Sequence, residues 1–152
     1  MCVFDAVWGE GQLSGMSNPL SPRQVASQWF QRIWVQHDES AIAELMAPEA
    51  LGHLEGGKVC RGPDEFRDFF RSLTGVFPDL KIEILDIIEE GEKAVVRWSA
   101  RGTHAGEGMG VPSNSVQSFS GITWFIVRDG RIVEGGDSWD MGGLLARMAA
   151  VV

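Results

Sequence analysis

The spacing of apolar residues changes along this chain from a helical period to an alternating one. Near the start, four apolar residues recur at helical spacing: Val25, Trp29, Ile33 and Trp34. Such spacing is typical of a helix with one broad apolar face. Ser21 and Gln24 fit a capping box, and Pro22 suits a first helical turn. The pattern predicts a helix over residues 21–37.

Two further helices are predicted before the period changes. A short helix over residues 38–46 ends before Pro48. Together with the first helix it forms a helical hairpin. After an extended piece over residues 50–55 and a glycine turn, a third helix begins at residues 62–64. Its large apolar residues share one face: Phe66, Phe69, Phe70 and Leu73.

The second half of the chain has the alternating pattern of β-strands. Four runs show it: residues 80–89, 94–104, 116–127 and 131–139. Gly91 and Gly130 lie in short turns, so we expect hairpins and an antiparallel sheet. A glycine-rich loop over residues 106–114 separates the second and third runs, and Asp140 caps a final helical turn or two. Helices followed by strands indicate an α+β domain with helices on one face of a curved sheet.

Length and charge narrow the possibilities. The 152 residues suffice for one domain; we place it at residues 21–150 and treat 1–20 as an N-terminal extension that is flexible or docks on a neighbour. The net charge of −8, with scattered basic residues, disfavours nucleic acid and anionic membranes as partners. Cys2 and Cys60 match neither a disulfide framework nor a zinc site. With no signal-peptide pattern at the start, we expect a cytoplasmic protein.

Six short phrases, in this order, resemble the SnoaL-like polyketide cyclase family. They are residues 77–80 (FPDL), 96–98 (VRW), 101–104 (RGTH), 119–122 (FSGI), 129–134 (DGRIVE) and 137–140 (DSWD). The resemblance implies a curved, mostly antiparallel sheet wrapped with three N-terminal helices into a cone with an internal cavity. This is the fold that the family shares with nuclear transport factor, scytalone dehydratase and ketosteroid isomerase. The resemblance alone does not fix a reaction, because the fold hosts cyclases, isomerases, dehydratases, epoxide hydrolases and binders.

Asp137 is the main candidate for acid/base chemistry. Alternation along the last strand places it on the same face as Trp139, and the family's acid/base aspartate falls at this position. A carboxyl group in an apolar cavity has a raised pKa and can exchange a proton near neutral pH. A carboxylate at the rim, in water, is the alternative. Asp140, the next acidic residue, is explained by its helix cap.

Two histidines are candidates to assist Asp137. His53 lies in the first extended segment, near the position of the base carboxylate in ketosteroid isomerase, and imidazole suits proton transfer at neutral pH. His104 continues the apolar face of the second strand run, so we expect it inside, near the cavity mouth. The alternatives are a surface histidine at 53 and a hydrogen-bonded structural histidine at 104.

Four aromatic residues are candidates to bind a flat substrate: Trp98, Phe119, Trp124 and Trp139. Ordinary core packing is the alternative for each of them. The chain has no tyrosine, so the tyrosine hydroxyl that some relatives use as an acid is missing. That departure puts a direct transfer of the ketosteroid isomerase mechanism in doubt.

These candidates support three functional hypotheses. The leading one is an enzyme without metal or other cofactor that enolises a small apolar carbonyl compound, followed by aldol-type ring closure or isomerisation. The second is hydration or hydrolysis in the same cavity, and the third is a non-catalytic binding module. Because residues 116–127 are apolar on both faces, we also expect a homodimer through the open face of the sheet.

Overall fold

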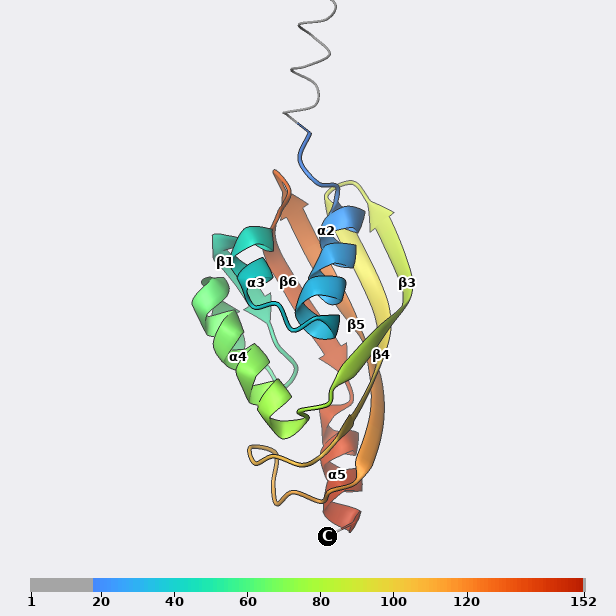
Figure 1. Cartoon of the computed structure of the whole chain (residues 1–152). Coiled ribbons are helices and arrows are strands. Elements are labelled where there is room, and N and C mark those ends of the chain that lie inside the picture. The colour runs from blue at the N-terminus through green and yellow to red at the C-terminus, as the bar shows by residue number, and fades with distance from the viewer. Residues whose placement is uncertain (1–17, 152) are drawn as a thin grey trace, which may run out of the picture.

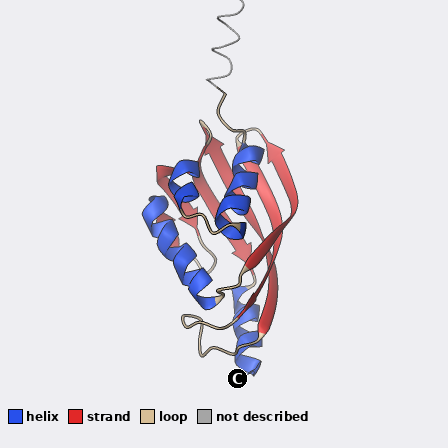
Figure 2. Cartoon of the chain, viewed as in Figure 1, coloured by secondary structure: helices blue, strands red, loops and turns tan. Residues whose placement is uncertain are grey.

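Six strands form one curved, open sheet in this computed structural model, which describes residues 18–151 (Figures 1 and 2). The sheet order is β2-β1-β6-β5-β4-β3. The strands are β1 (Met46–His53), β2 (Val59–Arg61), β3 (Lys81–Glu90), β4 (Lys93–Thr103), β5 (Val116–Arg128) and β6 (Arg131–Trp139). Neighbouring strands are antiparallel except β1 and β6, which run parallel. The predicted α+β class with a mostly antiparallel sheet is confirmed.

The helices differ slightly from the prediction of three at the N-terminus. They are α2 (Pro22–Gln28) with its continuation η1 (Trp29–Val35), α3 (Ser40–Leu45), α4 (Gly62–Val76) and α5 (Met141–Val151). Strands β1 and β2 precede α4, so two helical units stand before the sheet instead of three. The final turn or two predicted after Asp140 is an eleven-residue helix, α5.

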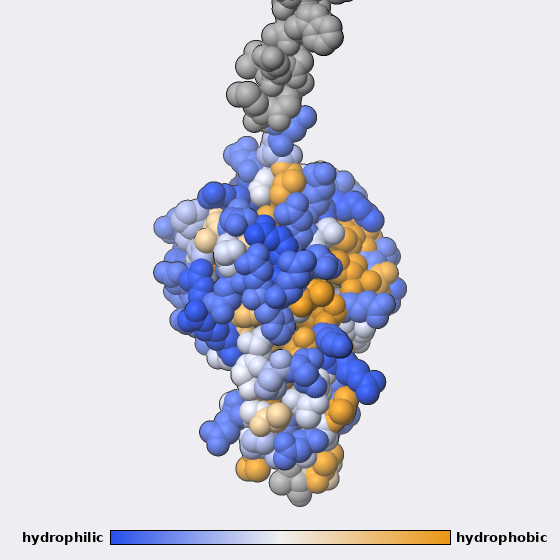
Figure 3. All heavy atoms as spheres, in the orientation of Figure 1, coloured by the Kyte–Doolittle hydropathy of each residue, from blue (hydrophilic) through white to orange (hydrophobic). Residues whose placement is uncertain are grey.

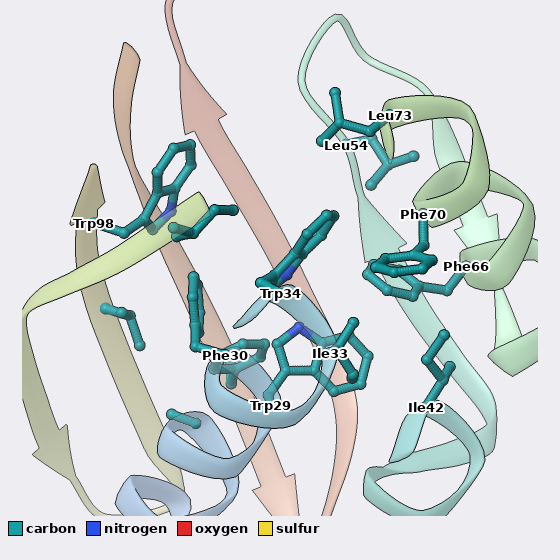
Figure 4. Close-up of a cluster of buried hydrophobic side chains, with 14 of the residues drawn as sticks. Trp29, Phe30, Ile33, Trp34, Ile42, Leu54, Phe66, Phe70, Leu73 and Trp98 are labelled. Carbon is teal, nitrogen blue, oxygen red and sulfur yellow. The ribbon is translucent and has the colours of Figure 1, made fainter. Parts of the chain in front are cut away.

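The first helix changes its winding halfway along. It starts as predicted, because the Ser21 hydroxyl accepts the Gln24 N–H and the Gln24 side chain accepts the Ser21 N–H. From Trp29 it continues as a π-helix, in which residues five positions apart are bonded. Trp29 and Trp34 therefore lie on the same side and are both buried, between η1, the sheet and α4 (Figure 4).

A cluster of aromatic rings joins the first helix to α4. The ring of Phe66 lies 4.8 Å from that of Trp29, and Phe70 lies 5.3 Å from Trp34. These four side chains are at most 7% exposed. Since burying one large apolar side chain contributes about 1.5–3 kcal/mol, this contact is a main support of the helix layer.

The two faces of the sheet have different surroundings. On β5, Phe119 and Phe125 are buried under the helices on what we call the inner face, whereas Val116 and Ile122 are exposed on the opposite, outer face. The prediction that residues 116–127 are apolar on both faces is confirmed. A bulge at Leu85 bends the edge strand β3.

Three boundaries differ from the sequence-based expectations. β1 begins at Met46, directly after α3, so it starts four residues earlier than the predicted extended piece. The short strand β2 was not predicted. The extension at residues 1–20 lies almost wholly outside the described residues, so that assignment stays a prediction. No helix within the described range is long and apolar enough to cross a membrane.

Candidate active site

Asp137 points from β6 into the space between the sheet and the helices. It stands opposite Thr123 of β5, and the Thr123 hydroxyl donates a hydrogen bond of 2.7 Å to Asp137 Oδ1. The indole N–H of Trp98 donates in turn to Thr123 Oγ1 at 2.9 Å. An indole N–H can only donate, so Thr123 Oγ1 accepts from Trp98 and its own proton is free to bond the carboxylate. Oδ1 is thereby held in place, while Oδ2 has no protein donor within residues 18–151.

The surroundings of Asp137 raise the pKa of its carboxyl group to about 6. Burial is the main cause, because the low-dielectric interior disfavours the charged form. The Thr123 hydrogen bond lowers this pKa, and the negative charge of Glu55 raises it by a smaller amount. The residue as a whole keeps some accessible surface, which it presents to the cavities that it lines. Its proton is therefore exchangeable near neutral pH.

Two small inner cavities lie beside Asp137. One has a volume of about 40 Å³, and its wall includes Trp29, Trp34 and Phe66. The other, of about 20 Å³, is bounded by Trp98 and Phe119 among others. Asp137 and Thr123 line both. A water molecule needs roughly 10–15 Å³, so these inner cavities have room for single waters or for one projecting group of a substrate.

A larger chamber of about 480 Å³, lined in part by α4, adjoins the smaller inner cavity. We call it the outer chamber because it is the more open space; the name does not refer to the outer face of the sheet. The chamber and this inner cavity share Phe69, Leu73 and Trp139 as wall residues. Its polar wall groups are Glu55, Lys58, Ser72 and Glu107. The glycine-rich loop over residues 106–114 supplies Glu107, Gly108 and Met109 to this wall. The chamber has the volume of a small-molecule site, and Trp139 borders both the chamber and the cavity that Asp137 lines.

Three of the four predicted aromatic residues lie at this site. Trp98, Phe119 and Trp139 all belong to the wall of the 20 Å³ cavity. Gly121 makes room for the two tryptophan side chains, since a Cβ there would lie 2.7 Å from the Trp98 ring and 2.7 Å from the Trp139 Cβ. Their role in binding a substrate stays a prediction that this placement favours.

His53 and Trp124 lie on the other face of the sheet. In the register, Trp124 and His53 flank Gly136 on the outer face, where their rings stack at 5.9 Å. The imidazole pairs there with Glu134, at 2.8 Å from Nε2 to Oε2. Although His53 contributes to the wall of the 40 Å³ cavity, its ring is turned away from Asp137. Both residues thus border one cavity, as their predicted convergence requires, but their side chains leave opposite faces of the sheet. A shared proton-transfer role of His53 and Asp137 stays a prediction.

His104 is buried as expected, but in a different place. It is 1% exposed and belongs to neither inner cavity. The backbone N–H of Ser113 donates to its Nδ1 at 3.2 Å, and the Ser113 hydroxyl lies 2.9 Å from the same atom. The ring of Phe77 lies 6.0 Å from the imidazole and 5.8 Å from the ring of Phe119, which borders the 20 Å³ cavity. The role predicted for His104 beside Asp137 stays a prediction that this placement does not favour.

Sequence reasoning missed Thr123 and Glu55. Thr123 is the sole protein donor to the Asp137 carboxyl group among the described residues. Glu55 accepts the backbone N–H of Trp139 at 3.1 Å and lines the outer chamber. The alternation of β5 could have placed Thr123 on the inner face, but only the register of β5 with β6 puts it opposite Asp137. No comparable signal identifies Glu55.

Thr123→Val should raise the pKa of Asp137 further and lower stability. Valine keeps the shape but removes the donor to the carboxylate, and it leaves the buried indole N–H of Trp98 without its acceptor. We expect a loss of about 1–3 kcal/mol in the free energy of unfolding. Chemical denaturation measures the loss, and the carboxyl ¹³C shift of Asp137 measures its titration midpoint. Thr123→Ser, which retains the hydroxyl, is the control; a midpoint that is the same in both variants would contradict the role assigned to Thr123.

Helices packed on a curved, open sheet place the chain in the class of cone folds that the nuclear-transport-factor-like proteins share. Within that class, the chain belongs to the SnoaL-like polyketide cyclase family, whose model matches residues 24–148. The resemblance drawn from the six phrases is confirmed. A search of curated proteins finds no match to this chain.

Solved structures agree with this assignment. One is a proposed SnoaL-like polyketide cyclase from Jannaschia sp. CCS1, at 25% identity and a TM-score of 0.76, covering 86% of this chain and 90% of the other. IdmH, a proposed polyketide cyclase from Streptomyces antibioticus, has 28% identity and a TM-score of 0.76, with coverages of 86% and 99%. AclR from Streptomyces galilaeus, a proposed hydroxylase, has 26% identity and a TM-score of 0.73, with coverages of 86% and 83%. Proteins of this fold thus carry different reaction names.

Proposed function

We propose that the protein is an acid/base enzyme for a small, mainly apolar carbonyl compound, with Asp137 as the group that moves the proton. The observation that carries this proposal is the Trp98–Thr123–Asp137 hydrogen-bond chain, which holds one carboxyl oxygen of a residue that lines both inner cavities. A carboxyl group with a pKa of about 6 accepts a proton at neutral pH and returns it in the next step.

The outer chamber would hold the body of the substrate. Its apolar wall, with Phe69, Leu73 and Trp139, suits rings or alkyl chains. The acidic C–H next to the carbonyl group would project past Trp139 toward Asp137. Proton removal gives an enolate, and Lys58 and Ser72 on the chamber wall are the side chains that could donate to its oxygen. Attack of the enolate carbon on a second carbonyl group, or reprotonation at another carbon, would complete ring closure or isomerisation.

Isotope exchange tests this proposal without knowledge of the natural substrate. The protein is incubated in D₂O with 2-tetralone, a bicyclic ketone with acidic C–H groups, and incorporation is followed by ¹H NMR. We expect exchange above the buffer rate that is lost in Asp137→Asn. Exchange that persists in this variant would contradict the assignment. Binding at the site with no exchange would favour a non-catalytic binding module.

A second candidate is hydration or hydrolysis with Asp137 activating water. The specific observation in its favour is the size of the two inner cavities, about 40 and 20 Å³, which suits single waters. Incubation in H₂¹⁸O with styrene oxide separates the two reactions, because hydrolysis places the label in the diol. If the protein is an enolising enzyme, we expect deuterium at carbon in the 2-tetralone experiment. We then expect no diol whose formation from styrene oxide depends on Asp137.

We also propose a homodimer formed through the outer face of the sheet. Cross-strand neighbours Ile88, Val95 and Trp124 form an apolar row there, and Ile88 is 62% exposed. Figure 3 shows hydrophobic side chains gathered on the side where β3 and β4 lie, whereas the helix-covered part of that view is mainly hydrophilic. A second copy would cover this surface by a twofold contact.

Trp124→Glu should convert this dimer into monomers, because it places a charge in the middle of the apolar row. Sedimentation velocity at micromolar concentration measures the oligomeric state. Gln31→Glu, which adds the same charge to an exposed position on η1, is the matched control and should leave the dimer intact. A monomer for the unmodified protein at this concentration would refute the proposal.

A further inference from the structure

A pocket remains that the proposed active site does not use. It lies between α5 and the loop that joins β4 to β5, two segments that Figure 1 shows side by side. We call it the α5 pocket; its volume is about 380 Å³. Its side chains come from both segments: His104, Met109, Val111, Leu145, Met148 and Ala149. It has no wall residue in common with the inner cavities, and only Met109 also borders the outer chamber.

The hydrogen bonds of His104 define which ring nitrogen carries its proton. The backbone N–H of Ser113 donates to Nδ1, and because a backbone N–H can only donate, Nδ1 must be unprotonated. In the neutral ring the proton then lies on Nε2. This side of the ring is held firmly, since the His104 backbone also bonds Ser115 and Asn114 across the base of the loop, at 2.9 Å each.

Nε2 is a buried donor without an acceptor in the described part of the chain. Buried polar groups normally have a hydrogen-bond partner, so an orphan donor needs an explanation. A single ordered water is a less favourable explanation, because a buried water takes about three partners and His104 is the sole polar side chain that it would find on this wall. A ligand atom with a lone pair would satisfy the donor while its apolar part filled the pocket.

We propose that the α5 pocket binds a small, uncharged, mainly apolar molecule through one oxygen acceptor, such as a ketone or an ether, which accepts from His104 Nε2. The wall of aliphatic and methionine side chains excludes a charged ligand, because no countercharge is present on it. Val111 and Leu145 are 70% and 38% exposed, so a ligand seated here would also cover apolar surface. Because Nε2 is buried, the flexible side chains of Met109 and Met148 have to shift for a ligand oxygen to reach it. This site is independent of Asp137.

Acetophenone and ethylbenzene are matched probes, since they have similar shapes and only the first has a carbonyl group. Each is titrated into the full-length protein, and the methyl NMR signals of Val111, Leu145 and Met148 report occupancy. We expect acetophenone to shift these signals in the unmodified protein and in Asp137→Asn alike. Signals that do not move, or shifts confined to residues around Asp137, would overturn the proposal.

Two neighbouring alanines of α5 give a blocking variant and its control. Ala149 and Ala150 are both exposed, but only Ala149 lines the pocket. Ala149→Phe should fill the pocket and abolish the shifts, whereas Ala150→Phe should leave the dissociation constant unchanged. If both variants bind acetophenone equally well, the ligand lies elsewhere and the proposal fails.

His104→Phe tests the hydrogen bond itself. It keeps the ring and removes the donor, so the preference for acetophenone over ethylbenzene should fall by about 3- to 10-fold, the effect of one hydrogen bond. An unchanged preference would overturn the role of Nε2. Because this variant also disturbs Ser113, the ¹⁵N shifts of His104 in the unmodified protein give a second test: a proton on Nδ1 instead of Nε2 would contradict the proposal even if the variant does not fold.

Discussion

Asp137→Asn is expected to abolish proton exchange and turnover while leaving ligand affinity nearly unchanged. Asparagine has the same shape, and its Oδ1 can still accept the Thr123 hydroxyl, but it cannot take up a proton. General acid/base groups typically contribute 10²- to 10⁴-fold to a rate, so exchange should fall by at least about 100-fold. The rate of deuterium incorporation and the dissociation constant of 2-tetralone measure the two effects.

The control for this variant is the neighbouring carboxylate. Asp140 is exposed, and its Oδ1 caps α5 by accepting the N–H of Gly143 at 2.9 Å. Asn caps a helix about as well as Asp, so Asp140→Asn should keep both activity and stability. In the unmodified protein the exchange rate should rise with pH through about 6, as the carboxylate forms. A rate that is independent of pH between 5 and 7 would contradict the role of Asp137 as the base.

The register between β5 and β6 explains why Asp137 was predicted and Thr123 was not. Alternation along one strand sufficed to place Asp137 beside Trp139 on a single face. Its partner depends on the pairing across the hairpin, where Arg128 stands opposite Arg131. In a regular hairpin, the pairing that begins there would continue without a shift and would place Ile122 opposite Asp137. The irregularity between Ile126 and Val127 shifts the pairing by one residue and brings Thr123 there instead. The sequence carries no visible signal for that shift.

The same limit applies to the direction of the His53 ring. Its segment alternates, but alternation does not tell which face is the inner one. Pairing with β6 decides this, because Gly52 stands beside Gly135 and His53 beside Gly136. Gly136 has no side chain, and a Cβ there would lie 2.6 Å from the indole nitrogen of Trp124. Trp124 and His53 thus occupy the space over a glycine on the outer face. The parallel pairing of β1 with β6 is a long-range contact that local patterns do not reveal.

Asp137→Asn is also expected to make the protein more stable at neutral pH. In the folded state the pKa of Asp137 is raised from 3.8 to about 6, so the folded protein keeps this proton longer than the unfolded chain does. Between these two values the unfolded chain binds fewer protons, and raising the pH therefore favours unfolding. The contribution of this group is fully present below about pH 4 and is lost as the pH rises through about 6. A shift of two pKa units corresponds to about 3 kcal/mol.

The measurement is the difference in the free energy of unfolding between the unmodified protein and the variant, from chemical denaturation at pH 3 to 8. Asp137→Asn should gain up to about 3 kcal/mol relative to the unmodified protein between pH 4 and 7. Asp79 provides a control of opposite sign, because bonds from the Thr103 N–H and hydroxyl lower the pKa of its carboxyl group. For Asp79→Asn, the advantage of the unmodified protein should shrink as the pH falls below about 4. If the curves for Asp137→Asn and the unmodified protein ran parallel from pH 4 to 7, the pKa of Asp137 would not be raised in the folded protein. The proposed role of Asp137 in proton transfer near neutral pH would then lose its support.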